Sequence, residues 1–318
     1  MSRCLKGPPI ILLAGPTAVG KTELALELAL HLDTEIVNAD SMQVYRFMDI
    51  GTAKPTQEER ARVVHHLLDV ARPDEAFDAA RYAELAQPVL EALRSRGRVP
   101  LIVGGTGLYM KVLTRGLCTG APGDPAVREE LLRELNERGL PTLHEELLRI
   151  DPDAGKRIHP HDRQRILRAL EVHRITGKPI SFYQSQHRFD QRFFRSIKIF
   201  LYRERNVLYE RINHRVLQMV DQGLLGEVRR LLEMGYGPEL KPMQSLGYRQ
   251  MAAHLQGLCS LESAVAEMQR ATRQYARRQL TWFRGDPEFC WIHAEDRKAI
   301  LEKIEVRESF SHKEQQGA

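Results

Sequence analysis

The sequence predicts an α/β fold in which helices flank a parallel sheet and a mostly helical domain is inserted into the chain. Two observations support this prediction. Short apolar runs alternate with helix-like segments through the first hundred residues, and this alternation stops near residue 120. We therefore expect a first part of the core over residues 1–119, a helical insertion over 120–196, and a return to the core with C-terminal helices over 197–318.

The first apolar run, residues 9–13, precedes a glycine-rich loop with the sequence GPTAVGKT and an apolar-periodic stretch at 24–32. This order is typical of the phosphate loop in P-loop NTPase-like sheets. Its glycines let the backbone bring successive N–H groups onto phosphate oxygens at a helix N-terminus. The lysine adds a positive charge, and the hydroxyl of Thr22 is the expected ligand of a Mg²⁺ ion. The predicted diphosphate-binding or triphosphate-binding residues are Gly15, Pro16, Thr17, Ala18, Val19, Gly20, Lys21 and Thr22.

Two later apolar runs end in segments suited to ligand binding. The run at residues 36–39 ends at Asp40, and the run at 99–103 ends at the GGTG sequence of residues 104–107. Ligands collect at the carboxyl ends of parallel strands, so we expect both segments to meet the phosphate loop. Asp40 suits a general base facing a phosphate-bound electrophile, although a carboxylate at this point can also cap a helix or a turn.

The sequence offers little support for nucleotide hydrolysis. A hydrolase pairs its phosphate loop with a strand that ends in a Mg²⁺-binding acid, and Asp69, in the run at 63–70, matches that pattern poorly. His65 and His66 in the same run would point to opposite faces of a strand, which favours a structural role over a metal site.

Helix-like segments account for most of the remaining chain. The insertion contains three, at residues 125–137, 140–149 and 162–175. A strand-like run at 197–202 returns to the core. Further helices are expected at 78–96, 206–221, 224–233 and 261–284.

Composition is that of an ordinary soluble globular protein, with 42% hydrophobic and 28% charged residues. No apolar run approaches the roughly 18 residues of a membrane span, and the chain enters its first strand without a signal peptide. The 4 cysteines form no CxxC pair, which predicts neither a zinc site nor a disulfide framework. We expect a cytoplasmic protein with no membrane partner.

Positive charge is concentrated in two segments. Residues 156–196 contain ten Lys or Arg against three acidic residues, an excess larger than the net charge of +5 for the whole chain. In the segment 261–284, four arginines fall on one helix face beside an apolar stripe: Arg270, Arg273, Arg277 and Arg284. A solvated surface would show the same pattern, but the phosphate loop and the aromatic residues interleaved in 182–193 favour a nucleic-acid partner.

Six motifs in this order and spacing resemble the bacterial tRNA dimethylallyltransferases. They are GPTAVGKT, NADSMQVYRFMDIGTAKPT, LIVGGTGLYM, DRQRILRALEVHRITGKPIS, SLGYRQM and ATRQYARRQLTWFRG. The likeness runs from about Pro9 to Gly285, and the DSMQVY and GGTGLY segments are more specific than the phosphate loop, which many kinases share. The resemblance implies a compact bacterial-type form, expected to be a monomer, without the zinc-finger region of the eukaryotic relatives.

The resemblance implies transfer of a dimethylallyl group from dimethylallyl diphosphate to N6 of the adenosine immediately 3′ of the anticodon, in tRNAs that read codons beginning with U. Diphosphate is released, the tRNA anticodon stem-loop is the partner, and Mg²⁺ is the implied cofactor. Asp40 would accept the N6 proton, Thr106 would contact the diphosphate or the reacting base, and Arg215 would be a second cation on the diphosphate. The resemblance and the basic helix face together give these tRNA-binding residues: Asp40, Ser41, Met42, Gln43, Thr106, Arg128, Gln164, Arg165, Ile166, Leu167, Arg168, Arg273 and Arg277.

This chemistry suits the residues, because the adenine amine is a poor nucleophile and the phosphate loop would stabilise the leaving group. Two alternatives stay open. A P-loop small-molecule kinase would use the loop for ATP and the insertion as a lid, but it leaves the excess of arginine unexplained. A nucleotide-regulated RNA-binding module would explain the arginines, but not Asp40 or the GGTGLY segment. A preference for dimethylallyl diphosphate over ATP would discriminate between them.

Overall fold

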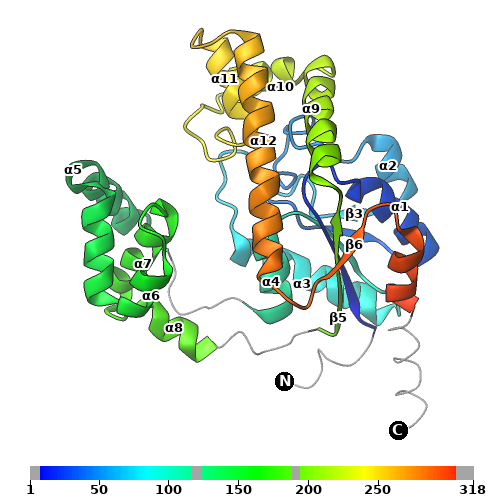
Figure 1. The fold of residues 1–318 in the computed structure, drawn as a ribbon, viewed down its shortest axis with the longest axis horizontal. Helices are drawn as coiled ribbons and strands as arrows, with labels where there is room; N and C mark the ends of the chain where they lie inside the picture. Colours follow the sequence, from blue (N-terminus) through cyan, green and yellow to red (C-terminus); the bar gives the residue numbers. More distant parts are fainter. Residues whose placement is uncertain (1–7, 117–122, 188–193, 306–318) are drawn as a thin grey trace. The chain divides into compact units, whose positions relative to one another are not determined.

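The structure is a computed structural model that describes residues 8–116, 123–187 and 194–305. The chain forms two compact units (Figure 1). An α/β unit contains residues 1–114 and 193–318, and a helical unit contains residues 115–192. The helical insertion was predicted at residues 120–196. Ser196 pairs with Ile10 of the sheet, however, and so belongs to the α/β unit.

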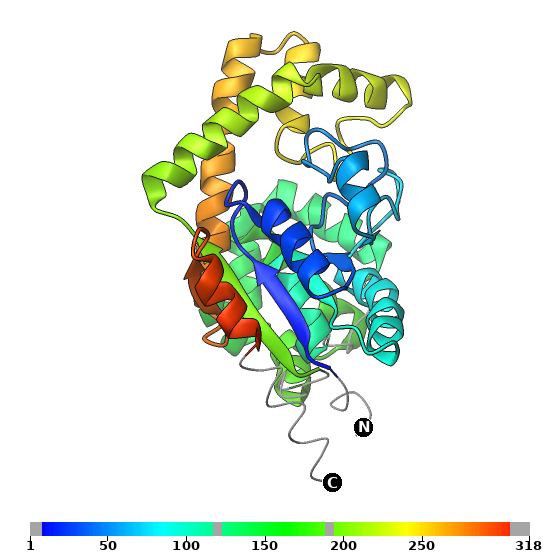
Figure 2. The same cartoon turned by 90° about the vertical axis from the view of Figure 1, so that its right-hand side faces the viewer.

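The described part of the α/β unit contains a six-stranded parallel sheet in the order β3-β2-β4-β1-β5-β6, which confirms the predicted fold class. The strands are β1 (Ile10–Ala14), β2 (Ile36–Asn38), β3 (His65–His66), β4 (Leu101–Gly104), β5 (Ser196–Tyr202) and β6 (Cys290–His293). β1 is fully buried between β4 and β5, and Figure 2 shows it beside β5 with α1 close to it. Its apolar run is continuous because elements pack on both faces of the sheet.

The α/β unit also contains most of the described helices. They are α1 (Lys21–His31), α2 (Gln57–Arg62), α3 (Ala79–Ser95), α4 (Gly107–Arg115), α9 (Arg205–Asp221), α10 (Leu224–Glu233), α11 (Tyr248–Leu255) and α12 (Leu261–Arg284), followed by a helical segment over residues 297–305. The helices expected at 78–96, 206–221, 224–233 and 261–284 are present with ends shifted by a residue at most. None of the described helices is long and apolar enough to cross a membrane.

Several elements of this unit differ from the sequence prediction. The apolar run at 63–70 forms only the two-residue strand β3, because Leu67 and Asp69 take positive φ angles of 62° and 57° and turn the chain out of the sheet. His65 and His66 of β3 bond to the carbonyl of Val63 and the carboxylate of Glu35, respectively. The elements α2, α4, α11 and β6 were not predicted, since they are short or begin inside segments that look like loops.

The helical unit consists of α5 (Pro125–Ile150), α6 (Pro152–Arg157), α7 (Arg163–Thr176) and α8 (Ile180–His187) in its described part. α5 is two helices joined at Gly139, whose φ of 78° and ψ of 159° are not helical, in agreement with the two separate helices that were predicted. The unit has its own apolar core, which includes Leu131, Leu143, Leu147, Ile166, Leu167 and Leu170.

Candidate active site

A cavity of about 1310 Å³ lies in the α/β unit at the carboxyl ends of the strands. Its walls are the phosphate loop after β1, the chain from residue 38 to 56 after β2, the end of β4, and the helices α9 and α12. The strand ends that the sequence predicted to converge therefore do converge. Residues from both halves of the α/β unit, far apart in the chain, line one site.

Three cationic side chains donate hydrogen bonds to the carbonyl groups of the phosphate loop. The donors are Lys21 Nζ to Gly15 and Pro16 (2.8 Å each), Arg203 Nε to Val19 (2.9 Å) and Arg211 Nε to Ala18 (2.9 Å). Gly20 then takes a φ of 110°, and α1 begins without a side-chain cap. The N–H groups in the first turn of α1 therefore have no intrahelical acceptor and form an anion site at a helix N-terminus.

The structure narrows the set of loop amides that was expected to bind phosphate. Pro16 has no N–H group, and the N–H of Thr17 donates to Oε1 of Gln279 at 3.0 Å. The N–H of Val19 points to the carbonyl of Pro16 at 3.4 Å. The available N–H donors therefore centre on the start of α1, and the binding of diphosphate by residues 15–22 stays a prediction.

Two cations and a carboxylate interact at the cavity. Burial, with the nearby charge of Arg215, lowers the pKa of Lys21 to about 7, and the carboxylate of Asp40 opposes this shift. Burial also lowers the pKa of Arg215, again opposed by Asp40. An anionic ligand in the cavity would favour the charged forms of both cations, because opposite charges raise the pKa of a base.

Asp40 occupies a tight turn at the end of β2. The Oδ1 atom of Asp40 accepts hydrogen bonds from the N–H groups of Met42 and Gln43, at 2.8 and 3.4 Å. The N–H group of Asp40 donates to Oδ1 of Asn38 at 3.0 Å. One carboxylate oxygen thus performs the turn-capping role that was considered as an alternative. The side chain also lines the cavity, so a structural and a chemical role are compatible.

Thr106 links the end of β4 to the end of β2. Its Oγ1 accepts from the N–H of Ser41 at 3.0 Å, and its own N–H donates to the carbonyl of Ala39 at 3.1 Å. A Cβ at Gly104 would overlap the backbone of Ala39, so only glycine permits this approach. Gly104 is therefore required by the contact between the two neighbouring strand ends.

Sequence analysis missed the residues that hold the chain after β2 in place. The carboxylate of Glu227 on α10 accepts from the N–H groups of Asp49, Ile50 and Gly51, at 3.0, 2.8 and 3.2 Å, and from the hydroxyl of Tyr248. Glu227 is 3% exposed. A glutamate within an apolar helical stripe was the only available signal, and its partners lie far away in the sequence.

A second ionic cluster fixes the same segment. Lys54 Nζ contacts the carboxylates of Asp49 and Asp69 at 2.6 Å each, and Arg60 contacts Asp69 at 2.8 Å. These cations hold the pKa of Asp69 below its usual value. Asp69, the nearest candidate for the Mg²⁺-binding acid of a hydrolase, is therefore occupied by salt bridges.

The described residues contain no cluster of three or more His, Cys, Asp or Glu side chains able to hold a metal ion. Thr22 lines the cavity at the start of α1. A Mg²⁺ ion fits this arrangement if the phosphate oxygens of a substrate supply most of its ligands, as is usual for Mg²⁺.

On α12, the predicted RNA-binding arginines differ in their surroundings. Arg277 is exposed, whereas Arg273 donates from Nη1 to Oδ1 of Asn213 on α9 at 2.5 Å. Arg273 therefore helps to join two helices that line the cavity. Arg277 is the freer of the two to contact a partner.

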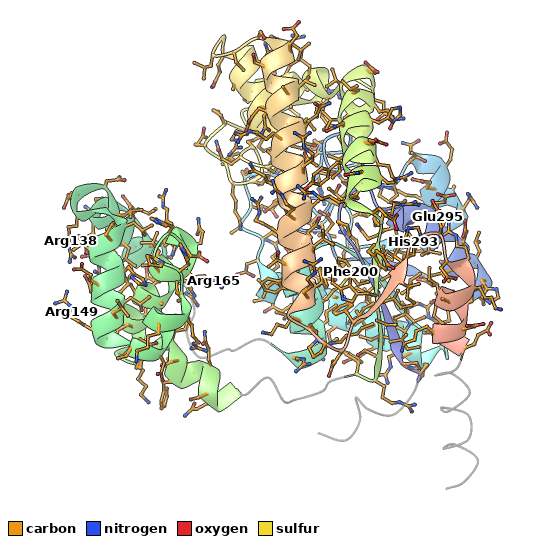
Figure 3. The ribbon with its side chains drawn as sticks, viewed as in Figure 1. Arg138, Arg149, Arg165, Phe200, His293 and Glu295 are labelled. Atoms are coloured by element: carbon orange, nitrogen blue, oxygen red, sulfur yellow. The ribbon has the colours of Figure 1, made fainter. Side chains whose placement is uncertain are left out.

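Within the helical unit, Arg165 and Gln164 are the exposed members of the predicted RNA contacts on α7. Arg165 is 61% exposed and lies 3.3 Å from Asp162. Figure 3 shows its side chain on the surface of this unit, as it does for Arg138 and Arg149. Arg128 donates to Gln164 at 2.9 Å, and Arg168 pairs with Glu171 at 2.9 Å.

Two of the predicted tRNA-binding residues are wrong as side-chain contacts. Ile166 and Leu167 are 0% exposed and form part of the apolar core of the helical unit. On a helix, neighbours of exposed residues turn inward, so a contiguous run cannot all face a partner.

The fold and the cavity define a P-loop α/β protein whose phosphate loop faces a carboxylate and two buried cations. Residues 43–286 match the IPP transferase family, and the chain belongs to that family. A protein named tRNA dimethylallyltransferase from Syntrophobacter fumaroxidans is 62% identical over 95% of this chain and 88% of the relative. Another of that name from Desulfosudis oleivorans is 52% identical over 95% of each chain.

Solved structures of tRNA prenyl transferases are also similar to this chain. The full-length tRNA isopentenylpyrophosphate transferase from Bacillus halodurans has a TM-score of 0.69 at 39% identity, over 96% of this chain and 99% of that one. A eukaryotic dimethylallyltransferase, described as acting on tRNA, has a TM-score of 0.75 at 27% identity, over 95% of this chain and 77% of that one.

Proposed function

We propose that this protein transfers a dimethylallyl group from dimethylallyl diphosphate to N6 of the adenosine immediately 3′ of the anticodon, in tRNAs that read codons beginning with U. The family and the relatives named tRNA dimethylallyltransferase support prenyl transfer to tRNA. The structural observation that carries the proposal is the shared cavity, in which the phosphate loop and Asp40 line the same space. A leaving-group site and a proton acceptor are the two functions that this reaction needs.

In the reaction, the bond between C1 of the allyl group and the diphosphate oxygen breaks while a bond from N6 to C1 forms. The negative charge that grows on the diphosphate would be stabilised by the amides at the start of α1, by Lys21 and by Arg215. A Mg²⁺ ion bound through Thr22 would add to this neutralisation. These groups favour departure of diphosphate, which compensates for the weak nucleophile.

N6 loses a proton as it becomes a secondary amine, and Asp40, which lines the cavity, would accept that proton. The turn around Asp40 fixes one carboxylate oxygen with two backbone N–H groups, which limits the rotation of the side chain. Thr106 holds the backbone of Ser41 and so maintains this turn. The target adenosine must leave its base stack to enter the cavity, at a cost of a few kcal/mol that contacts to the RNA backbone would offset.

The kinase and RNA-binding-module alternatives are less favoured. The chain belongs to a transferase family, and Asp69 is held by Lys54 and Arg60 instead of being free for a metal. We also propose that the protein works in the cytoplasm, where its tRNA substrate is found, and as a monomer, which light scattering would test.

The decisive experiment combines the protein with dimethylallyl diphosphate, Mg²⁺ and an anticodon stem-loop, and identifies the nucleosides by mass spectrometry. We expect a prenylated adenosine at the position 3′ of the anticodon, and no product when that adenosine is replaced by guanosine. Turnover of ATP without prenyl transfer would contradict the proposal.

The Lys21→Ala variant serves as the matched test of the site. Removing one stabilising group for a developing negative charge costs about 10²–10³ in rate. We expect that loss in turnover, with stem-loop affinity within a few-fold of the parent. Equal loss of both would refute the separate roles of the phosphate loop and the arginine surfaces.

A further inference from the structure

Gln279 on α12 joins the two loops that follow β1 and β4. Its Oε1 accepts from the N–H of Thr17 at 3.0 Å, and its Nε2 donates to the carbonyl of Gly105 at 3.1 Å. The side chain is 5% exposed. A single buried amide therefore bridges the phosphate loop and the GGTG loop, which come from neighbouring strands.

The two partners allow only one orientation of this amide. If its oxygen and nitrogen were exchanged, the oxygen would face a carbonyl and the nitrogen would face an N–H group, and both contacts would be repulsive. Among the natural side chains, only a primary amide offers one acceptor and two donors at a single planar end. A carboxylate of the same length satisfies Thr17 but not the carbonyl of Gly105.

The position of Gln279 is fixed by packing on both sides. One turn further along α12, the ring of Phe283 lies 4.8 Å from the ring of Phe200 on β5, and Ala276 is fully buried. On the loop side, a Cβ at Gly105 would overlap Nε2 of Gln279. The absence of a side chain at Gly105 is therefore what allows the amide to reach both loops.

We propose that Gln279 is a positioning residue for the diphosphate, because it sets the separation between the phosphate loop and the loop that carries Thr106. This inference rests on the proposed function, since it assumes that a diphosphate binds at the phosphate loop. Gln279 directs the N–H of Thr17 away from the ligand and thereby fixes the path of the chain toward the start of α1. Its effect on chemistry is exerted through these loops.

The test measures binding of inorganic diphosphate with Mg²⁺ by calorimetry, in the full-length protein. Gln279→Leu preserves volume and leaves the N–H of Thr17 and the carbonyl of Gly105 without partners. We expect affinity to fall about tenfold, in the range that a lost buried hydrogen-bond pair produces. Gln87→Leu, which removes an exposed amide bonded to Glu91 on α3, should leave affinity unchanged.

Gly105→Ala gives an independent second test, because its added Cβ displaces the same amide. We expect Gly105→Ala to weaken diphosphate binding in the parent and to have little further effect in the Gln279→Leu background. In turnover assays, KM for dimethylallyl diphosphate should rise and affinity for the stem-loop should stay constant. Equal effects of Gly105→Ala in both backgrounds would overturn the proposal.

Thermal unfolding separates positioning from a purely structural role. A lower Tm with unchanged diphosphate affinity in Gln279→Leu would show that Gln279 only supports the fold, and would refute the inference. Lys21→Ala tests the assumption beneath it. If Lys21→Ala binds diphosphate with the parental affinity, the phosphate-loop site and the proposed function are both refuted. If Lys21→Ala loses affinity but Gln279→Leu keeps the parental affinity, only the inference about Gln279 is refuted.

Discussion

The α/β unit and the helical unit use their basic residues in different ways. In the α/β unit, Lys21, Arg203 and Arg211 donate to backbone carbonyls of the phosphate loop. In the helical unit, Arg174 bonds to the carboxylate of Glu134 at 2.6 and 2.9 Å, whereas Arg165 is largely exposed. The first group shapes an anion site, and the second combines internal ion pairs with a charged surface.

This difference shows why a local count of charges is a weak guide to a binding surface. The excess of positive charge in residues 156–196 is partly balanced by Glu134 and Glu146 of α5, which lie outside that window and contact Arg174. An arginine held between acidic side chains, as Arg174 is, contributes less to the attraction of a polyanion than an arginine that is largely exposed. The following tests separate cations and acids that build the site from those that face the solvent.

The largest effect is expected for Asp40→Asn, which keeps the shape of the turn and removes the proton acceptor. We expect the single-turnover rate to fall by about 10²–10⁴, with small changes in the affinity for either substrate. Asp33→Asn, on an exposed side chain that pairs with Arg98, is the control. A variant that reacts at the parental rate would reduce Asp40 to a turn residue.

Next in size is Leu167→Ala in the core of the helical unit. Truncating a fully buried leucine lowers the free energy of unfolding by about 2–5 kcal/mol. We expect chemical denaturation to show this loss in the helical unit, while inorganic diphosphate still binds the α/β unit. If Leu167→Ala has parental stability but reduced RNA affinity, the side chain is an RNA contact after all.

The pH dependence of diphosphate binding is a third test. The pKa of Lys21 is about 7 in the free protein, and a bound anion raises it, so binding takes up a proton above that pH. Affinity should be highest below pH 7 and fall by up to tenfold per pH unit as the pH rises above it. The Lys21→Ala variant, measured in parallel, retains the titration of diphosphate itself and should lack this additional slope.

The smallest effects concern the exposed arginines. Neutralising one phosphate contact should lower the slope of log K against log salt by about 0.7–0.9. We expect this for Arg165→Ala and for Arg277→Ala with an anticodon stem-loop. Arg138→Ala is the matched control, because Arg138 pairs with two acids, Glu134 and Glu146, at 2.7 and 3.0 Å and is 39% exposed, whereas Arg165 has one acidic neighbour and is 61% exposed. Unchanged slopes for both test variants would indicate a merely solvated surface.

Local sequence patterns predicted the parts of the fold whose conformation is set by residues close together in the chain. The phosphate loop, the break at Gly139 and the long helices carry glycine or periodic patterns that determine backbone conformation within a few residues. The convergence of Asp40, Thr106 and the loop followed from a general property of parallel sheets. The family resemblance identified Arg215, which no pattern in its own helix distinguishes.

The residues that sequence analysis missed act across long separations in the chain. Gln279 bonds to Thr17, and Glu227 bonds to residues 49–51. Each is a polar residue on an amphipathic helix, where a solvent-facing position is the ordinary expectation. Their burial depends on which helix covers which loop, and no local pattern contains that information.

The position of β1 also has a consequence for how the protein folds. β1 pairs with β5, so the centre of the sheet joins segments that lie on opposite sides of the whole helical unit in the sequence. Contacts of such long range slow folding, because the chain between them loses entropy when the loop closes. The helical unit has a core of its own, and its early formation would shorten the effective length of that loop. Leu167→Ala, although it lies in the helical unit and outside the sheet, would then slow the pairing of β1 with β5.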